Sequence, residues 1–149
     1  MNSNPGGDSL NDTGWTRVLA HRLRDGEPAV HETIARFEAA GVTPSELETH
    51  LIDGGDRLYA AAVGGEEGWA APFGGDRAAA LIAAEISALM SHLVARAASV
   101  RGVCVDGLLE EYSAVTVANA LGVARQKVYG LAKPDVDPDY IERTPWSGS

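Results

Sequence analysis

Apolar residues recur every three or four positions along most of this chain, which is the spacing of an amphipathic helix. Before residue 64 we expect helices over residues 15–24, 28–40, 43–52 and 58–63. Asp25-Gly26 and Gly41 separate them, and Pro28 and Pro44 suit a first helical turn. Long β-branched runs with strand-like alternation are missing from the sequence. The pattern predicts an all-α protein, a helical bundle.

The longest helical pattern begins at Asp76 and is expected to form a central helix over residues 76–111. Its apolar stripe consists of Ile82, Ile86, Leu89, Leu93, Ala97, Val100, Cys104 and Leu108. We expect Gly102 and Gly107 to bend or split this helix near its end. A sparse polar stripe is expected to face solvent; it consists of Glu85, His92, Arg96 and Ser99. Polar residues also interrupt the apolar stretch from about Ala78 to Val100, namely Glu85, Ser87, His92 and Arg96, so we expect it to fall short of a membrane span.

Two interpretations of the long helix stay open. Its apolar stripe packs on the amino-terminal helices, or the helix pairs with the same helix of a second copy. Small residues would permit the close approach of another helix, namely Ala83, Ala84, Ala88, Ala95 and Ala98. We expect a homodimer with residues 76–111 as its interface.

The segment from Ser113 to Lys133, SAVTVANALGVARQKVYGLAK, predicts two short helices joined by a tight turn. Its apolar spacing closes the two helices on one shared core, formed by Val117, Leu121, Val123, Val128 and Leu131. Ala118 is small where the helices would cross. Gly122 stands where the first helix must stop, because glycine adopts positive φ without steric cost. This is a helix-turn-helix arrangement without a wing, because no β-hairpin pattern follows Lys133.

The same segment resembles the helix-turn-helix of bacterial DNA-binding regulators, most closely in VANALGV and RQKVY. The resemblance implies that residues 113–121 form the supporting helix and that residues 124–133 read the major groove. It implies that Arg125, Gln126, Tyr129 and Lys133 face DNA while Val128 and Leu131 hold the helix down. The sequence departs from the family pattern at Ala124, where a capping serine is common, and at Gly130 within the second helix.

The implied chemistry suits DNA. Arginine bridges guanine O6 and N7, and glutamine bridges adenine N6 and N7, so Arg125 and Gln126 are the expected base readers. Tyr129 and Lys133 are expected to meet phosphates. Ser113 and Thr116, at the start of the first helix, are expected to donate to phosphate with help from the helix dipole.

The charge distribution favours the same segment. The chain carries a net charge of −9, yet residues 112–134 contain three basic side chains and no Asp or Glu. The three are Arg125, Lys127 and Lys133. Phosphate contact needs a local positive face rather than a positive molecule.

The chain is expected to divide into six parts. Residues 1–14 form a disordered tail, 15–63 an amino-terminal helical region, 64–75 a Gly-rich loop, 76–111 the long helix, 112–133 the helix-turn-helix and 134–149 an acidic, Pro-rich tail. Trp69 and Phe73 give the loop anchors. With Trp15 they would also line a small pocket, although core packing is the default for such residues.

Other classes of site find little support in the sequence. A single cysteine, Cys104, rules out an intramolecular disulfide and a cysteine-cluster zinc site, and it suits a reducing cytoplasm. Glu46, His50 and Asp53 share one side of a helix, but no second cluster completes a metal-ligand set. The phosphate-cradling GxxxxGK[ST] and the nucleophile turn GxSxG are missing. We therefore expect no enzyme, no metal and no cofactor.

The sequence predicts a cytoplasmic, nucleoid-associated protein that binds double-stranded DNA in a sequence-specific way, as a homodimer and without a membrane partner. Transcriptional regulation is the favoured use, with nucleoid organisation and plasmid or phage control as neighbouring ones. The alternative is a protein-interaction module whose acidic surface docks a polymerase, a sigma factor or another partner. In that case the acidic tail would supply the anchors Tyr140, Ile141 and Trp146.

Overall fold

The computed structural model describes residues 14–147, which form helices, turns and extended segments but no strand. The all-α prediction is confirmed, and so is the long central helix, α6 (Asp76–Glu111). The expected tail at residues 1–14 lies outside the described residues except for Gly14. The chain separates into two compact units, residues 1–90 with 141–149 and residues 91–140. The division falls inside α6, so each unit owns part of that helix.

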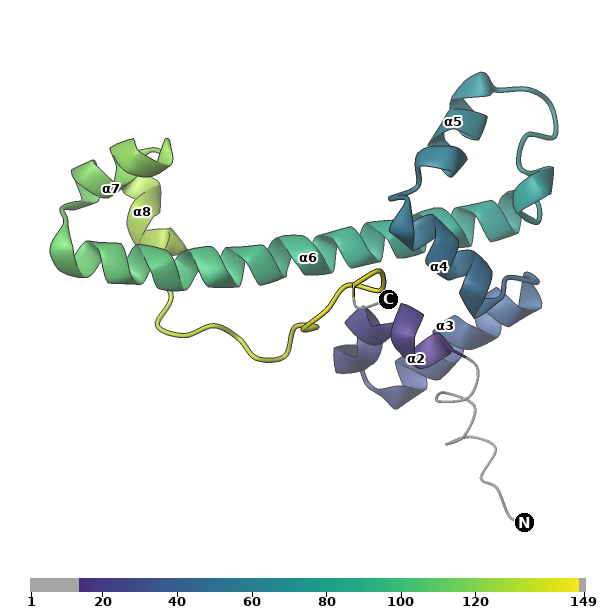
Figure 1. Cartoon of the computed structure of the whole chain (residues 1–149), viewed down its shortest axis with the longest axis horizontal. Coiled ribbons are helices and arrows are strands. Elements are labelled where there is room, and N and C mark those ends of the chain that lie inside the picture. Colours follow the sequence, from purple (N-terminus) through teal and green to yellow (C-terminus); the bar gives the residue numbers. More distant parts are fainter. Residues whose placement is uncertain (1–13, 148–149) are drawn as a thin grey trace, which may run out of the picture. The chain divides into compact units, whose positions relative to one another are not determined.

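The amino-terminal unit contains short helices followed by the first half of α6 (Figure 1). They are α2 (Trp15–Val18), the 3-10 helix η1 (Ala20–Asp25), α3 (Glu27–Ala39), α4 (Pro44–Ile52), α5 (Asp56–Gly64) and the 3-10 helix η2 (Ala71–Phe73). The predicted first helix is therefore a four-residue α-helix followed by 3-10 turns, and the other predicted helices agree within a few residues.

Thr43 and Glu46 form a capping box at the start of α4. The Thr43 hydroxyl accepts from the Glu46 backbone N–H at 3.1 Å, and the Glu46 carboxylate accepts from the Thr43 backbone N–H at 3.0 Å. This reciprocal pair satisfies two donors that a helix start leaves open. The local sequence alone therefore sets where α4 begins.

The three aromatic residues that were expected to line one pocket, Trp15, Trp69 and Phe73, lie in two separate clusters. Trp15 is buried and stacks on Phe37, with ring centroids 5.7 Å apart. Phe73 lies against His50 at 5.5 Å and against Trp69 at 6.4 Å. A pocket shared by Trp15, Trp69 and Phe73 is therefore not formed. The two loop aromatics do anchor the 64–75 segment, which contains η2.

The buried face of α6 is the clearest difference from the prediction. Ile82 and Leu89 of the expected apolar stripe are buried, but Ala97, Val100 and Cys104 are exposed. Three members of the supposed solvent-facing polar stripe are buried instead, namely Glu85, His92 and Ser99. The helix also continues unbroken through Gly102 and Gly107. In the middle of α6, the buried face is therefore formed by polar side chains that have partners and not by the predicted apolar stripe.

Glu85 shows why a carboxylate lies inside the amino-terminal unit. Its side chain is 2% exposed and accepts from His21 Nε2 at 2.6 Å and from the Arg22 guanidinium at 2.7 and 2.9 Å. Burial acts to raise the pKa of Glu85, but the hydrogen bonds from His21 and Arg22 outweigh it and hold that pKa below its ordinary value. The contacts of Glu85 with His21 and Arg22 join η1 to α6 and fix how the two elements align.

By length and composition, α6 qualifies as a membrane span, contrary to the expectation from its polar interruptions. It contains an 18-residue window of mean hydropathy 1.7, of which 28% is buried. The core helix of a water-soluble protein meets the same criteria, so the observation is weak evidence for a bilayer.

Candidate nucleic-acid interface

The carboxy-terminal unit contains two short helices, α7 (Ala114–Leu121) and α8 (Arg125–Leu131). Ser113 caps α7, because its hydroxyl accepts from the Thr116 backbone N–H at 3.2 Å. Gly122 ends α7 in the left-handed region, with φ of 69°, as predicted. The next N–H, of Val123, donates to the Ala118 carbonyl at 3.1 Å and completes the turn.

A small apolar core holds α7 and α8 against the end of α6. Its fully packed members are Val105, Ala114, Val117, Ala118 and Val128. The prediction is right for Val117, Ala118 and Val128, and Val123 and Leu131 are partly buried against the same core. It is wrong for Leu121, which is 42% exposed, because α7 turns that side chain toward solvent at its last residue.

Of the α6 residues in this core, only Leu108 belongs to the predicted apolar stripe. Cys104 was predicted on the inner face, whereas Cys104 is exposed and the next residue, Val105, is 1% exposed. Leu108 and Leu109 also pack on the core. The signal was present in the sequence, because Val105 follows Ser99 and Gly102 at helical spacing. Reading it required knowing that Ser99 and Gly102 face inward.

Helix α8 is shorter than predicted. It ends at Leu131, so Lys133 lies beyond it rather than on a helix of residues 124–133. Ala124 precedes the helix and makes no side-chain capping hydrogen bond, as its methyl group dictates. The Lys133 backbone N–H donates to the Gly102 carbonyl of α6 at 3.0 Å. Lys133 therefore remains a candidate phosphate contact only from the segment after α8.

The outward face of α8 carries most of the other predicted DNA contacts. Val128 is fully buried, and Arg125, Gln126, Lys127 and Tyr129 are exposed, Tyr129 by 69%. At about 100° per residue, Gln126 and Gly130 project almost opposite to Val128, and Lys127 and Tyr129 flank them on either side. We call Gln126, Lys127, Tyr129 and Gly130 the outward face of α8. Arg125 lies beside it in the first turn.

Gly130 lies on that face without any structural need for glycine. Its φ is not positive, and a Cβ built on it would meet no atom within 4 Å. Glycine in a helix costs about 1 kcal/mol relative to alanine. Nothing within the described part of the chain offsets that cost.

The two hydroxyls at the start of α7 are not equivalent. Ser113 donates its hydroxyl proton to Thr116 Oγ1 at 3.0 Å while it caps the helix. The Thr116 hydroxyl accepts that bond and keeps its own proton for an outside acceptor. Of the two predicted phosphate donors, Thr116 is thus the better placed and Ser113 acts as the cap.

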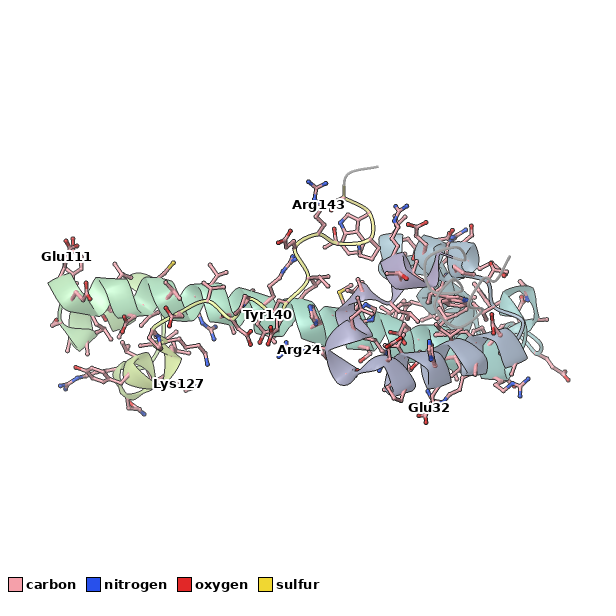
Figure 2. The ribbon with its side chains drawn as sticks, turned by 90° about the horizontal axis from the view of Figure 1, so that it is seen from below. Arg24, Glu32, Glu111, Lys127, Tyr140 and Arg143 are labelled. Carbon is pink, nitrogen blue, oxygen red and sulfur yellow. The ribbon has the colours of Figure 1, made fainter. Side chains whose placement is uncertain are left out.

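Acidic and basic side chains lie apart at this end of the carboxy-terminal unit. Figure 2 shows Glu111, at the end of α6, and Lys127, on α8, on opposite sides of the α6 axis. Residues 112–134 contain no Asp or Glu, and α8 carries the basic side chains Arg125 and Lys127, so the surface of α8 is cationic. A phosphate backbone that meets α8 is therefore approached by Lys127 rather than by Glu111.

The segment after α8 follows α6 as an extended strap, residues 132–140. A Cβ on Gly102 would lie 2.8 Å from the Leu131 carbonyl oxygen and 2.8 Å from Lys133 Cγ, so only glycine allows the strap to cross here. Further along, the Asp137 backbone N–H donates to Ser99 Oγ at 2.9 Å. The Tyr140 ring meets His92 at 5.3 Å, as Figure 2 shows for Tyr140 beside α6. Tyr140 thus packs within its own chain. In the alternative function, a tail that docks a protein partner, it would not serve as an anchor while it makes this contact.

The residues considered for metal binding have other partners. Asp53 accepts from the Gly55 backbone N–H at 2.8 Å and from Arg57 Nε at 3.1 Å. Burial lowers the pKa of His50, and the charge of Arg57 lowers it further. Across residues 14–147, no three His, Cys, Asp or Glu side chains come together in a way that would hold a metal ion.

Comparisons of this chain with family models, with curated proteins and with solved structures found no match. The case for any function therefore depends on the residues themselves.

Proposed function

We propose that this protein binds double-stranded DNA through α7 and α8, with α8 in the major groove, and that it regulates transcription. One observation carries the proposal: Val128 and Leu131 hold α8 against the core, and α8 turns a cationic, acid-free face outward. The resemblance to helix-turn-helix regulators supports the same function, with α7 as the supporting helix.

The side chains divide into readers and positioners. Gln126, at the centre of the outward face, has the donor and acceptor pair that adenine N7 and N6 require. Arg125 has the geometry to bridge guanine O6 and N7 from the first turn. Lys127, Tyr129 and Thr116 suit phosphate oxygens, which fix the register without reading sequence.

Gly130 gives this proposal a second support. A helix seated in a groove brings its outermost residues close to base edges, and a residue without a side chain lets the backbone approach most closely. An approaching duplex would therefore account for a glycine that the folded chain itself does not need.

A homodimer completes the proposal, because symmetric helix-turn-helix proteins bind two half-sites related by the same two-fold axis. Small residues on α6 would allow a second α6 to approach closely; Ala84 is exposed and Ala88, Ala95 and Ala98 are half-buried. Sedimentation equilibrium of the full chain tests the dimer independently of DNA.

The direct test is selection of bound duplexes from a random pool, followed by affinity measurements over a range of salt concentrations. We expect one enriched palindrome and an affinity that falls steeply with salt, by about 0.9 log units per log unit of salt for each phosphate neutralised. Lys127→Ala should lower that slope by about 1, and Gln126→Ala should relax the preference at one base pair. Arg36→Ala, which removes the same charge from α3, is the matched control. If no duplex is retained at low salt, the proposal is wrong.

A further inference from the structure

An open groove lies in the amino-terminal unit between α5 and the start of α6. It holds about 400 Å³, within the range of small-molecule sites. In Figure 1 the 65–75 segment leads from α5 back to the beginning of α6, which makes these two helices the opposite walls of the groove. The residues that matter for its chemistry are Leu58, Tyr59, Trp69, Asp76, Ala83 and Ile86.

The groove exists because small residues face each other across it. At one end, Gly55 approaches Ile86 so closely that a Cβ on Gly55 would lie 3.0 Å from Ile86 Cδ1. Between Asp76 at the start of α6 and that contact, α6 lines the groove with Ala79, Ala80 and Ala83, whose side chains cannot fill the space. The larger side chains line the walls, and Tyr59 is 73% exposed. The site is thus formed by the fold and has aromatic rings at its surface.

Among the residues that the structure describes, the one charged residue in the lining of the groove is acidic. Asp76 lines it, and no lysine or arginine does. The nearby cations are directed elsewhere, because Arg57 pairs with Asp53 at 3.1 Å and Arg77 donates to the Ala39 carbonyl at 2.8 Å. Glu66 and Glu67 stand exposed on the adjoining 65–75 segment. Any ligand in this groove meets apolar walls and a negative field.

We propose that this groove binds an organic cation with a large apolar body. The apolar walls would take up the body, and the faces of Trp69 and Tyr59 would attract the positive charge as aromatic rings attract cations. Asp76 supplies the carboxylate that balances this charge. A second copy of this chain is the less suitable occupant of the groove, because an acidic chain would meet the like charges of Asp76, Glu66 and Glu67 there. The homodimer proposed above uses other positions of α6. The proposal does not depend on DNA binding.

The experiment is calorimetric titration of the full chain with tetraphenylphosphonium and, separately, with tetraphenylborate. The two ions have nearly the same size and shape and opposite charges. We expect the phosphonium to bind at one site per chain and the borate to bind this site at least tenfold more weakly. Trp69 fluorescence, compared with that of a Trp69→Phe variant, reports whether binding occurs in the groove.

Matched variants locate the site. Ala83→Leu fills the groove and should reduce phosphonium affinity at least tenfold. Ala35→Leu, at an exposed position of α3 outside the lining, should leave that affinity unchanged. Asp76→Asn should weaken the phosphonium severalfold and narrow its advantage over the borate. Asp56→Asn, which removes a carboxylate from the first turn of α5 outside the lining, is its control.

Three results would overturn the proposal. The first is phosphonium binding that Ala83→Leu leaves unchanged, while circular dichroism shows that the variant is folded. The second is borate binding in the groove at equal or higher affinity, which would make the site apolar without charge preference. The third is an absence of phosphonium binding. If Ala83→Leu then dissociates a dimer and Ala35→Leu does not, the groove is assigned to a second copy.

Discussion

Gly130→Ala separates what α8 needs for folding from what the proposed DNA binding requires. The substitution adds one methyl group to the outward face of α8, in a backbone conformation that alanine adopts readily. The added Cβ would meet no atom within 4 Å, so it clashes with nothing in the folded chain. Only a bound partner could clash with the added methyl group.

The expected effect on stability follows from helix propensity. Alanine should raise the free energy of unfolding by about 1 kcal/mol relative to glycine. For a chain of this size that corresponds to a rise in Tm of about 2–4 °C. The effect on DNA should have the opposite sign, because the methyl group stands between the α8 backbone and the groove floor. We expect the affinity for the selected duplex to fall about tenfold, which is about 1.4 kcal/mol.

Gly107→Ala is the matched control. Gly107 also lies inside a helix and is exposed, and a Cβ there likewise meets nothing within 4 Å, but it belongs to α6. It should give a similar rise in Tm without any change in DNA affinity. Thermal melts by circular dichroism and fluorescence anisotropy with a labelled duplex measure the two quantities on the same samples.

Two outcomes refute the reasoning. If Gly130→Ala stabilises the protein as Gly107→Ala does and leaves DNA affinity unchanged, the α8 backbone does not approach DNA closely at Gly130. If Gly130→Ala lowers Tm, the space around Gly130 is occupied in solution and the stability argument fails.

Two further predictions concern burial and close approach. Glu85→Gln should lower the free energy of unfolding at neutral pH by about 2–3 kcal/mol, because Arg22 loses a charged partner; Glu32→Gln, in an exposed pair, should cost little. The pKa of Glu85 is depressed in the folded state, so its contribution to the free energy of unfolding is complete above about pH 4.3 and is lost as pH falls through the folded-state pKa. Chemical denaturation across that range should therefore show a free energy of unfolding that falls less steeply with decreasing pH in Glu85→Gln than in the parent chain. Gly102→Ala should free the strap that crosses at Lys133, seen as faster proteolytic cleavage after α8, whereas Gly107→Ala should be cleaved like the parent chain.

Local signals in the sequence were enough to predict much of the fold. Thr43 and Glu46 mark the start of α4, and Gly122 marks the end of α7, because capping groups and positive φ depend on a few neighbouring residues. Val117 and Val128 were identified as core by their spacing, and their burial confirms it. The helices and the inner residues of the α7–α8 pair are therefore largely predictable from local sequence.

Contacts between distant residues explain what the sequence analysis missed. Lys133 was predicted to lie on α8, but its backbone N–H donates to the Gly102 carbonyl of α6. No local sequence pattern predicts that the segment after α8 crosses α6 at this point. Gly102 was interpreted as a helix bend because glycine weakens helices. Gly102 instead leaves room for the backbone of residues 131–133 to cross α6. That requirement depends on two segments far apart in the sequence, so the sequence around Gly102 does not reveal it.

The misassigned face of α6 has the same origin. Hydropathy treats a carboxylate or an imidazole as a solvent-facing group, since burying one without partners is costly. Glu85, His92 and Ser99 recur at every seventh residue and are buried together because each meets a specific partner: Arg22 and His21, Tyr140, and the Asp137 N–H. A partnered polar group costs little to bury and fixes register more strictly than leucine would, because only one alignment satisfies it. Polar residues at heptad spacing on a long alanine-rich helix are therefore candidates for its inner face.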